Sequence, residues 1–237
     1  MSDKINVVIL AAGKGTRLKI DMAKPLVPCL GRPLVGHVVE ALLQFESKTK
    51  SSLDIGVVVG HKKDELKAYL DQSFSHEFSY AHQKEQLGTG HALQTFFKTY
   101  PNAWDRPFTF ILCADTPLIT SKTYEVLMSN LKSKNLNALV ASFKKKDPKG
   151  YGRIIKESMG LKIIEEKDAD DNQRKIQEVN SALYLLSTSH IKENILNLSS
   201  NNKANEFYLT DLFKPEFAVE PILFEDAGSF EGINNLA

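Results

Sequence analysis

Small residues and cations are concentrated in one short stretch near the N-terminus. Residues 10–17 read Leu-Ala-Ala-Gly-Lys-Gly-Thr-Arg, directly after an apolar run, and Lys24 follows soon after. Glycine and alanine let backbone N–H groups approach a ligand closely, and lysine and arginine neutralise negative charge. The stretch therefore predicts a polyphosphate site, with nucleotide contacts from Leu10, Ala11, Ala12 and Gly13.

Two common phosphate-binding loops do not match this stretch. A P-loop needs Gly-Lys-Ser/Thr after four intervening residues, and no such order is present. The dinucleotide fingerprint would need a third glycine where Leu18 stands. The turn alone leaves a second interpretation open, a tight strand-to-helix connection whose cations, Lys14 above all, are only solvated.

The stretch also resembles the signature of the sugar-1-phosphate nucleotidylyltransferases, Leu-x-x-Gly-x-Gly-Thr-Arg followed by Lys-Pro-Leu or a variant. Six further motifs follow in order, and together they resemble the uridylyltransferase half of the bacterial bifunctional N-acetylglucosamine-1-phosphate uridyltransferases. The resemblance covers essentially the whole chain. The motifs are residues 83–92 (Gln-Lys-Glu-Gln-Leu-Gly-Thr-Gly-His-Ala), 114–118, 150–153, 165–169, 177–180 and 232–235.

Apolar runs alternate with amphipathic helical patterns through the first half of the chain. This alternation predicts an α/β fold with a doubly wound, mostly parallel Rossmann-like sheet, and the resemblance implies the nucleotidyltransferase type A fold. Beyond about residue 137 the strands lack long helices between them, which predicts a mixed-sheet lobe that binds the sugar; a helix is expected over 206–213. The expected strands are 5–10, 55–59, 78–82, 108–113, 138–143, 152–156, 161–165 and 179–186, and the earlier helices are 33–45, 62–70, 90–100 and 122–131.

We expect one domain over 1–237, with a nucleotide-binding half over about 1–135 and a sugar-binding half over about 136–237. No linker or internal repeat divides the sequence. The relatives usually continue into a left-handed β-helix of hexapeptide repeats, and this chain contains no such repeats. We therefore expect no acetyltransferase domain, and a monomer or weak oligomer without the contacts of that domain.

Charged residues near strand ends are the catalytic candidates. Nucleotidyl transfer needs charge neutralisation around the α-phosphate, and Mg²⁺ with few protein ligands suits that need. Asp115 follows an apolar strand and is the expected Mg²⁺ ligand; the resemblance implies that Asn234 shares the metal. Lys24 is expected at the reacting phosphates, and Arg17 at the departing pyrophosphate.

The choice of base is assigned to Gln83, whose amide offers a donor and an acceptor that match O4 and N3–H of the uracil of UTP. Gly88 and Thr89 are expected to complete this pocket. A glutamine that only caps a helix is the plainer alternative.

The resemblance implies that Gly152, Glu165 and Asn180 hold N-acetylglucosamine 1-phosphate, and Tyr208 and Thr210 are expected to close the pocket. Glu166 is a competing candidate for the role of Glu165. Since adjacent strand residues point to opposite faces, only one of the two can face the sugar.

Departures from the family pattern leave the substrate open. Ala114 stands where a glycine normally precedes the aspartate, and Asn-Ser-Ala at 180–182 stands for Asn-Thr-Gly. Changes of this size shift discrimination by about 1–3 kcal/mol. N-acetylmuramic acid 1-phosphate or glucose 1-phosphate, with UTP or dTTP, are therefore alternatives, as is a silent nucleotide-sugar sensor, although the full set of catalytic residues argues against the last.

Composition excludes several partners. Among 237 residues, 30 Lys and Arg nearly balance 29 Asp and Glu, so no broad surface for nucleic acid or anionic membranes is indicated. Two cysteines cannot build a disulfide framework or a cysteine-rich metal site. With no signal peptide or membrane span in the pattern, we expect a cytoplasmic protein.

Overall fold

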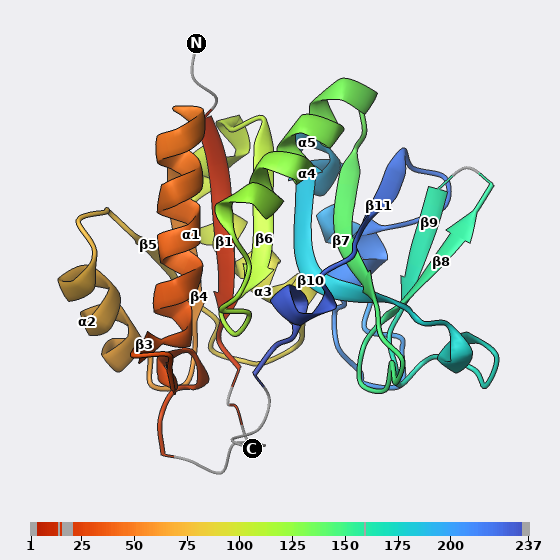
Figure 1. Ribbon diagram of the computed structural model, residues 1–237, viewed down its shortest axis with the longest axis horizontal. Helices are drawn as coiled ribbons and strands as arrows, with labels where there is room; N and C mark the ends of the chain where they lie inside the picture. The colour runs from red at the N-terminus through yellow and green to blue at the C-terminus, as the bar shows by residue number, and fades with distance from the viewer. Residues whose placement is uncertain (1–3, 14, 16–20, 159, 234–237) are drawn as a thin grey trace.

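A single mixed sheet organises the computed structural model, which describes residues 4–13, 15, 21–158 and 160–233 (Figure 1). The hairpin of β8 (Arg153–Glu157) and β9 (Gly160–Ile164) joins the sheet at β10, and β2 (Pro28–Cys29) pairs separately with β3 (Arg32–Pro33). In spatial order the main strands are β11 (Val219–Phe224), β7 (Ala138–Lys144), β10 (Glu178–Ser187), β6 (Phe108–Cys113), β1 (Lys4–Ala11), β4 (Ser52–Val59) and β5 (Ser79–His82).

Most strands of this sheet run in one direction. β5, β4, β1 and β6 pair in parallel, and β11 is parallel to β7. Among the main strands the reversed one is β10, which is antiparallel to both β6 and β7. The predicted α/β class with a mostly parallel sheet is confirmed, and β10 lies between strands from the two halves of the chain.

Helices cover both faces of the sheet because its strands are apolar on both sides. Along β1, Val7 and Ile9 enter one core and Val8 enters the other. The first core also contains buried residues of α1 (Leu34–Thr49), α2 (Lys63–Ser73) and α4 (Ser121–Lys134), and α1 and α4 lie in front of the sheet in Figure 1. The second contains residues of α3 (Thr89–Thr99) and α5 (Thr188–Asn194) on the opposite face.

Several elements differ from the sequence prediction, among them β2, β3 and the 3-10 segments, which were not expected. The helix expected over 206–213 is wrong: only η6 (Leu209–Leu212) is helical, because the backbone of Phe207 pairs with Leu87 and Gly90 and Tyr208 is extended. The seven-residue α5 and the edge strand β11 were not predicted, and β11 contains Pro221, which a sheet tolerates at an edge. Other 3-10 segments are η2 (Lys24–Leu26), η3 (Pro101–Asp105), η4 (Gln173–Lys175), η5 (Ile195–Asn197) and η7 (Ala227–Phe230).

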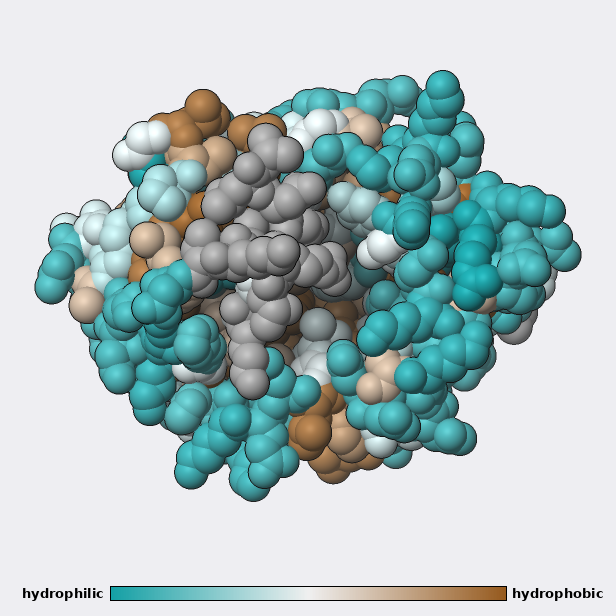
Figure 2. Space-filling model, turned by 90° about the horizontal axis from the view of Figure 1, so that it is seen from below, coloured by the Kyte–Doolittle hydropathy of each residue, from teal (hydrophilic) through white to brown (hydrophobic). Residues whose placement is uncertain are grey.

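The loops that follow the parallel strands gather at the lower end of the molecule in Figure 1. Figure 2 shows this end, where hydrophilic residues predominate on the side of β8 and β9. In the part of the chain described above, no helix has the length and apolar character needed to cross a membrane.

Candidate active site

A pocket of about 340 Å³, here called the central pocket, opens where β1, β5 and β6 end. The pocket brings together the seven residues that the sequence predicts to contact the nucleotide, and it also contains Lys24 and Asp115. Its walls are Leu10, Ala11, Ala12, Gly13, Lys24, Pro25, Gln83, Gln86, Gly88, Thr89, Ala92, Cys113, Ala114, Asp115 and Glu206.

The strand register explains why distant motifs meet here. Leu10 of β1 lies opposite Cys113 of β6, and Ala11 lies opposite Val59 of β4. The backbone N–H of Gln83 then donates to the Val59 carbonyl at 2.9 Å. The residues that follow β1, β5 and β6 therefore leave the sheet at one edge, as ligand-binding residues do in doubly wound sheets.

The glycine loop is shaped around Lys24. Gly15 has a positive φ of 60°, and a Cβ there would lie 2.8 Å from the Cβ of Lys24. Only glycine meets both requirements. Substitution of Gly15 would move the loop, Lys24 or both.

Lys24 and Asp115 form an ion pair in the wall of the central pocket. Their side chains are 17% and 21% exposed, so both charges remain accessible to a ligand. The Asp115 carbonyl accepts from the backbone N–H of Ile233 at 3.0 Å, and Gly232 lies against the Asp115 carboxylate. The C-terminal motif therefore reaches Asp115, whereas Arg17, Lys14 and Asn234 lie outside the described residues.

The amide of Gln83, only 4% exposed, is held in one orientation. Its Nε2 donates to the Gly88 carbonyl at 3.0 Å and lies 3.1 Å from Nδ1 of His91. A carbonyl can only accept, so the amide nitrogen must face Gly88. The amide nitrogen of Gln83 is therefore held by its own loop, and Oε1 is the atom that we expect to meet a ligand. The assignment of Gln83 to the base stays a prediction.

The turn at Gly88 precedes α3 and contacts Phe207 and Leu209 in the second half of the chain. Gly88 has a φ of 107°, and a Cβ there would lie 2.5 Å from the Phe207 carbonyl oxygen. The hydroxyl of Thr89 accepts from the N–H of Leu209 at 3.1 Å. Because the first N–H groups of a helix lack intrahelical acceptors, the start of α3 offers donors to an anionic or carbonyl ligand at the pocket.

A second group of predicted residues, here called the lobe cluster, comprises Gly152, Glu165, Asn180 and Thr210. Pairing of Arg153 with Ile164 and with Val179 puts Gly152, Glu165 and Asn180 in the next row across three strands. The Gly152 carbonyl accepts from the Asn180 N–H at 2.9 Å, and the Thr210 hydroxyl donates to Glu165 Oε1 at 3.0 Å.

Negative charge surrounds the lobe cluster. Burial raises the pKa of Glu165, the Thr210 hydrogen bond opposes that rise, and the charges of Asp168, Asp211 and Glu206 add to it. Burial and the neighbouring Asp168 carboxylate also raise the pKa of Tyr208. Tyr208 therefore lies at this acidic region, beside Asp168.

The side chain of Asn180 holds a bulge in β10. Its Nδ2 donates to the Tyr184 hydroxyl at 2.6 Å, and its Oδ1 accepts from the Ala182 N–H at 2.9 Å. Pairing of β10 with β7 shifts register between Asn180 and Tyr184, and Ala182 has a positive φ of 61°. Ala182 occupies the position at which the family pattern has glycine. The backbone at this position is left-handed although the residue is alanine.

Cys113 lies in the wall of the central pocket. Burial raises the pKa of its thiol to about 12, and the charges of Asp115, Lys24 and Glu165 all act on it. The central pocket and the lobe cluster are neighbours in one site, because Leu209, whose N–H donates to Thr89 of the pocket, directly precedes Thr210, whose hydroxyl donates to Glu165 of the cluster. Both cysteines are free, and Cys29 lies elsewhere, in β2.

Four pocket residues were not singled out from the sequence, namely Pro25, Gln86, Ala92 and Glu206. Gln86 donates from Nε2 to the Ala12 carbonyl at 2.6 Å and so joins the glycine loop to the 83–92 motif. Its position inside that motif was the available signal. Glu206 was assigned to a helix, and its role as a wall residue follows only from the pairing of the next residue, Phe207, with the Gly88 turn.

Residues 7–209 match the family described as the MobA-like NTP transferase domain. The chain belongs to this family. It is 36% identical over 231 residues to the bifunctional protein GlmU of Fervidobacterium nodosum, covering 98% of this chain and 48% of that protein. It is 37% identical over 235 residues to GlmU of Acinetobacter baylyi, covering 97% and 49% respectively. The chain thus spans about half the length of the curated relatives it matches.

A solved structure confirms the fold class. The uridine diphosphate N-acetylglucosamine pyrophosphorylase of Trypanosoma brucei superimposes with a TM-score of 0.74 at 16% identity, covering 98% of this chain and 61% of that one. The predicted membership of a nucleotidyltransferase family is therefore confirmed, with the fold that this membership implies.

Proposed function

We propose that the chain is a Mg²⁺-dependent uridylyltransferase that makes UDP-N-acetylglucosamine and pyrophosphate from UTP and N-acetylglucosamine 1-phosphate. The supporting observation is the adjacency of the central pocket and the lobe cluster, which the Thr89–Leu209 and Thr210–Glu165 hydrogen bonds join. A phosphate oxygen of the sugar phosphate attacks the α-phosphorus of UTP, and the bond to the departing pyrophosphate breaks. The chain's task is to align the two substrates and neutralise their charge.

Lys24 serves the reacting phosphates as a compact cation at the pocket wall. It is held there by its pairing with Asp115 and by the packing of Gly15. Arg17, close by in sequence, is assigned to the leaving pyrophosphate.

The residues at Asp115 fit a magnesium ion. Mg²⁺ takes one or two carboxylates plus phosphate oxygens rather than a full protein cage. Among the described residues no group of three or more His, Cys, Asp or Glu side chains could form such a cage, and Asp115 is the carboxylate in the central pocket beside the C-terminal motif. Asp115, with Asn234, would hold the ion, which when bound supplies Lewis-acid stabilisation of phosphate charge.

The orientation of Gln83 supports uridine as the nucleoside. Oε1 can accept from N3–H of uracil or thymine, whereas cytosine presents an acceptor at N3. N–H groups at the Gly88 turn supply donors for a base carbonyl. UTP and dTTP both satisfy this pattern of donors and acceptors. Discrimination between them depends on contacts with the 2′-hydroxyl of the ribose and with the methyl group of thymine.

The lobe cluster supports a sugar as the second substrate. Glu165 accepts from ring hydroxyls, and Gly152 with Asn180 faces the acetamido group. Glu165 can bind the sugar without a neighbouring cation, because two hydroxyl groups of the sugar can donate hydrogen bonds to its carboxylate oxygens.

Initial rates of pyrophosphate release with UTP, Mg²⁺ and N-acetylglucosamine 1-phosphate test the proposal. The expected result is release that requires both substrates and stops when the ion is chelated. Absence of release with both substrates and Mg²⁺ present would contradict it.

A further inference from the structure

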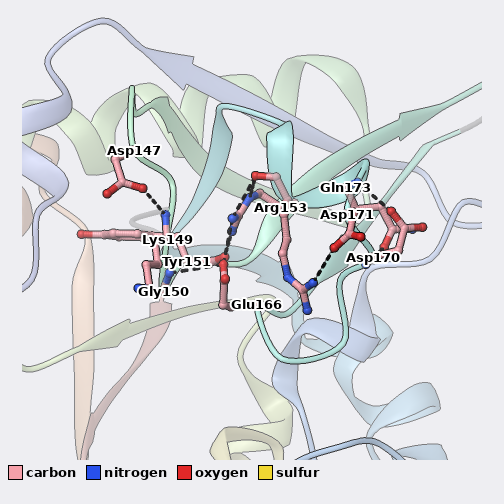
Figure 3. Close-up of polar contacts among 10 residues, drawn as sticks. Asp147, Lys149, Gly150, Tyr151, Arg153, Glu166, Asp170, Asp171 and Gln173 are labelled. Carbon is pink, nitrogen blue, oxygen red and sulfur yellow. Dashed lines mark hydrogen bonds and ion pairs between the residues drawn. The ribbon is translucent and has the colours of Figure 1, made fainter.

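The guanidinium of Arg153 is the most buried charged group of the lobe, and Arg153 directly follows Gly152 of the lobe cluster. Arg153, the first residue of β8, is 1% exposed, and its guanidinium forms an ion pair of 2.7 Å with Glu166. Figure 3 shows the pair among the loops of the lobe. Both residues are direct chain neighbours of cluster residues, since Arg153 follows Gly152 and Glu166 follows Glu165.

The guanidinium ties three segments together. It donates to the Tyr151 carbonyl and, at 3.2 Å and 3.4 Å, to the Arg174 carbonyl. Glu166 in turn accepts from the N–H of Gly150 at 3.2 Å. The turn before β8, the end of β9 and the loop over 170–175 are therefore held by one planar group, whose fixed fork sets their spacing.

That spacing determines the shape of the lobe cluster. A Cβ on Gly152 would lie 3.5 Å from Oε2 of Glu165 and 3.5 Å from the Cβ of Asn180. The ladder between β8 and β9 begins at Arg153 and Ile164, so no ladder pairing fixes Gly152 relative to Glu165. The ion pair one residue further along each segment supplies that constraint.

Charge placement points the same way. Glu165 already stands among the carboxylates of Asp168, Asp211 and Glu206, which raise its pKa. A second unpaired carboxylate at Glu166 would repel a phosphorylated sugar and could compete with Glu165 for its hydroxyls. Pairing with Arg153 offsets the charge of Glu166.

We propose that Arg153 and Glu166 are positioning residues for the sugar phosphate: their ion pair sets the distance between Gly152 and Glu165. This inference rests on the proposed function, because it assigns the lobe cluster to the sugar. It adds a pair of residues that act through Gly152 and Glu165 without touching the substrate.

The test compares Glu166→Gln, Arg153→Lys and the wild type in pyrophosphate release, using the sugar phosphate on which the wild type is most active. Glu166→Gln keeps the side-chain shape and removes the charge. Glu157→Gln is the matched control, since Glu157 pairs with Lys162 at 3.0 Å at the other end of the same hairpin, on the surface. The Michaelis constants for the sugar phosphate and for UTP are measured separately, with the melting temperature.

We expect Glu166→Gln to raise the Michaelis constant for the sugar phosphate about tenfold, because small displacements of positioning groups have effects of this order or larger. The constant for UTP should stay within about twofold, and Arg153→Lys should show the same split, because an ammonium cannot reproduce the fork. Glu157→Gln should change neither constant.

Equal changes in both constants, or a lowered melting temperature with unchanged constants, would mean that the pair only stabilises the fold and would overturn the inference. If Glu166→Gln does not fold, the decision rests on Arg153→Lys. A wild type that releases no pyrophosphate with any sugar phosphate overturns the proposed function, and this inference with it.

Discussion

Substitution of Asp115 by asparagine should separate catalysis from folding. The variant keeps the size of the side chain and removes the charge that faces Lys24 and the expected magnesium ion. The two side chains are 17% and 21% exposed, so the free energy lost with this ion pair lies between the values for surface pairs and for buried pairs. We expect a cost of about 1–2 kcal/mol in the free energy of unfolding. For a chain of this length, that lowers the melting temperature by about 2–8 °C.

Turnover should fall much further than stability. Removing a group that neutralises charge developing in a transition state lowers the turnover number by about 10²–10³-fold. The assay is pyrophosphate release at saturating substrates, at a temperature well below the melting point of the variant. A matched control is Asp54→Asn, because Asp54 pairs with Arg106 at the opposite end of the sheet and has no place in the site. The control should keep its turnover, and near-normal turnover of Asp115→Asn at ordinary Mg²⁺ concentrations would refute the metal assignment.

Four further predictions follow from the same site. Lys24→Ala should lower the turnover number, and an effect confined to the Michaelis constant for UTP would limit the lysine to ground-state binding. Gln83→Leu should raise the Michaelis constant for UTP about fivefold or more, through loss of one buried hydrogen bond, while that for the sugar phosphate stays unchanged in the same assay. Burial raises the pKa of Glu165 above its unfolded value, so the stability that its proton contributes is present at low pH and is lost as pH rises through the raised value. The sugar needs the ionised form, so its Michaelis constant should rise as pH falls through that value, and a pH profile of Glu165→Gln should lack this step. Ala182→Gly should raise the free energy of unfolding by up to about 1 kcal/mol, because Ala182 has a φ of 61°, and a lower melting temperature would contradict that reasoning.

The sequence predicted the half of the site whose residues follow strands. Gln83 and Asp115 each come directly after or close behind an apolar run, and parallel strands bring such residues to one edge. The glycine loop could likewise be predicted, since Gly15 is needed for its positive φ and its contact with Lys24. These are local signals, and local signals are visible in one sequence.

The lobe was harder to predict because its geometry depends on pairing between distant segments. The segment before η6 is not helical because the backbone of Phe207 pairs with Leu87 and Gly90, although the sequence over 206–213 has a helical pattern. The orientation of the Gln83 amide depends on Gly88 and cannot be read from residue types. The role of Arg153 was hidden for the same reason, since only the fold shows that it is buried and faces Glu166.

The most direct test of the central claim is pyrophosphate release by the wild-type chain across a panel of sugar phosphates and nucleoside triphosphates. The panel pairs the 1-phosphates of N-acetylglucosamine, glucose and N-acetylmuramic acid with UTP, dTTP and CTP, each with Mg²⁺ and with chelator. We predict the highest kcat/KM for UTP with N-acetylglucosamine 1-phosphate, little reaction with CTP, and none with chelator. A higher kcat/KM for another pair would contradict the substrate assignment, and no release with any pair would contradict the enzymatic function itself.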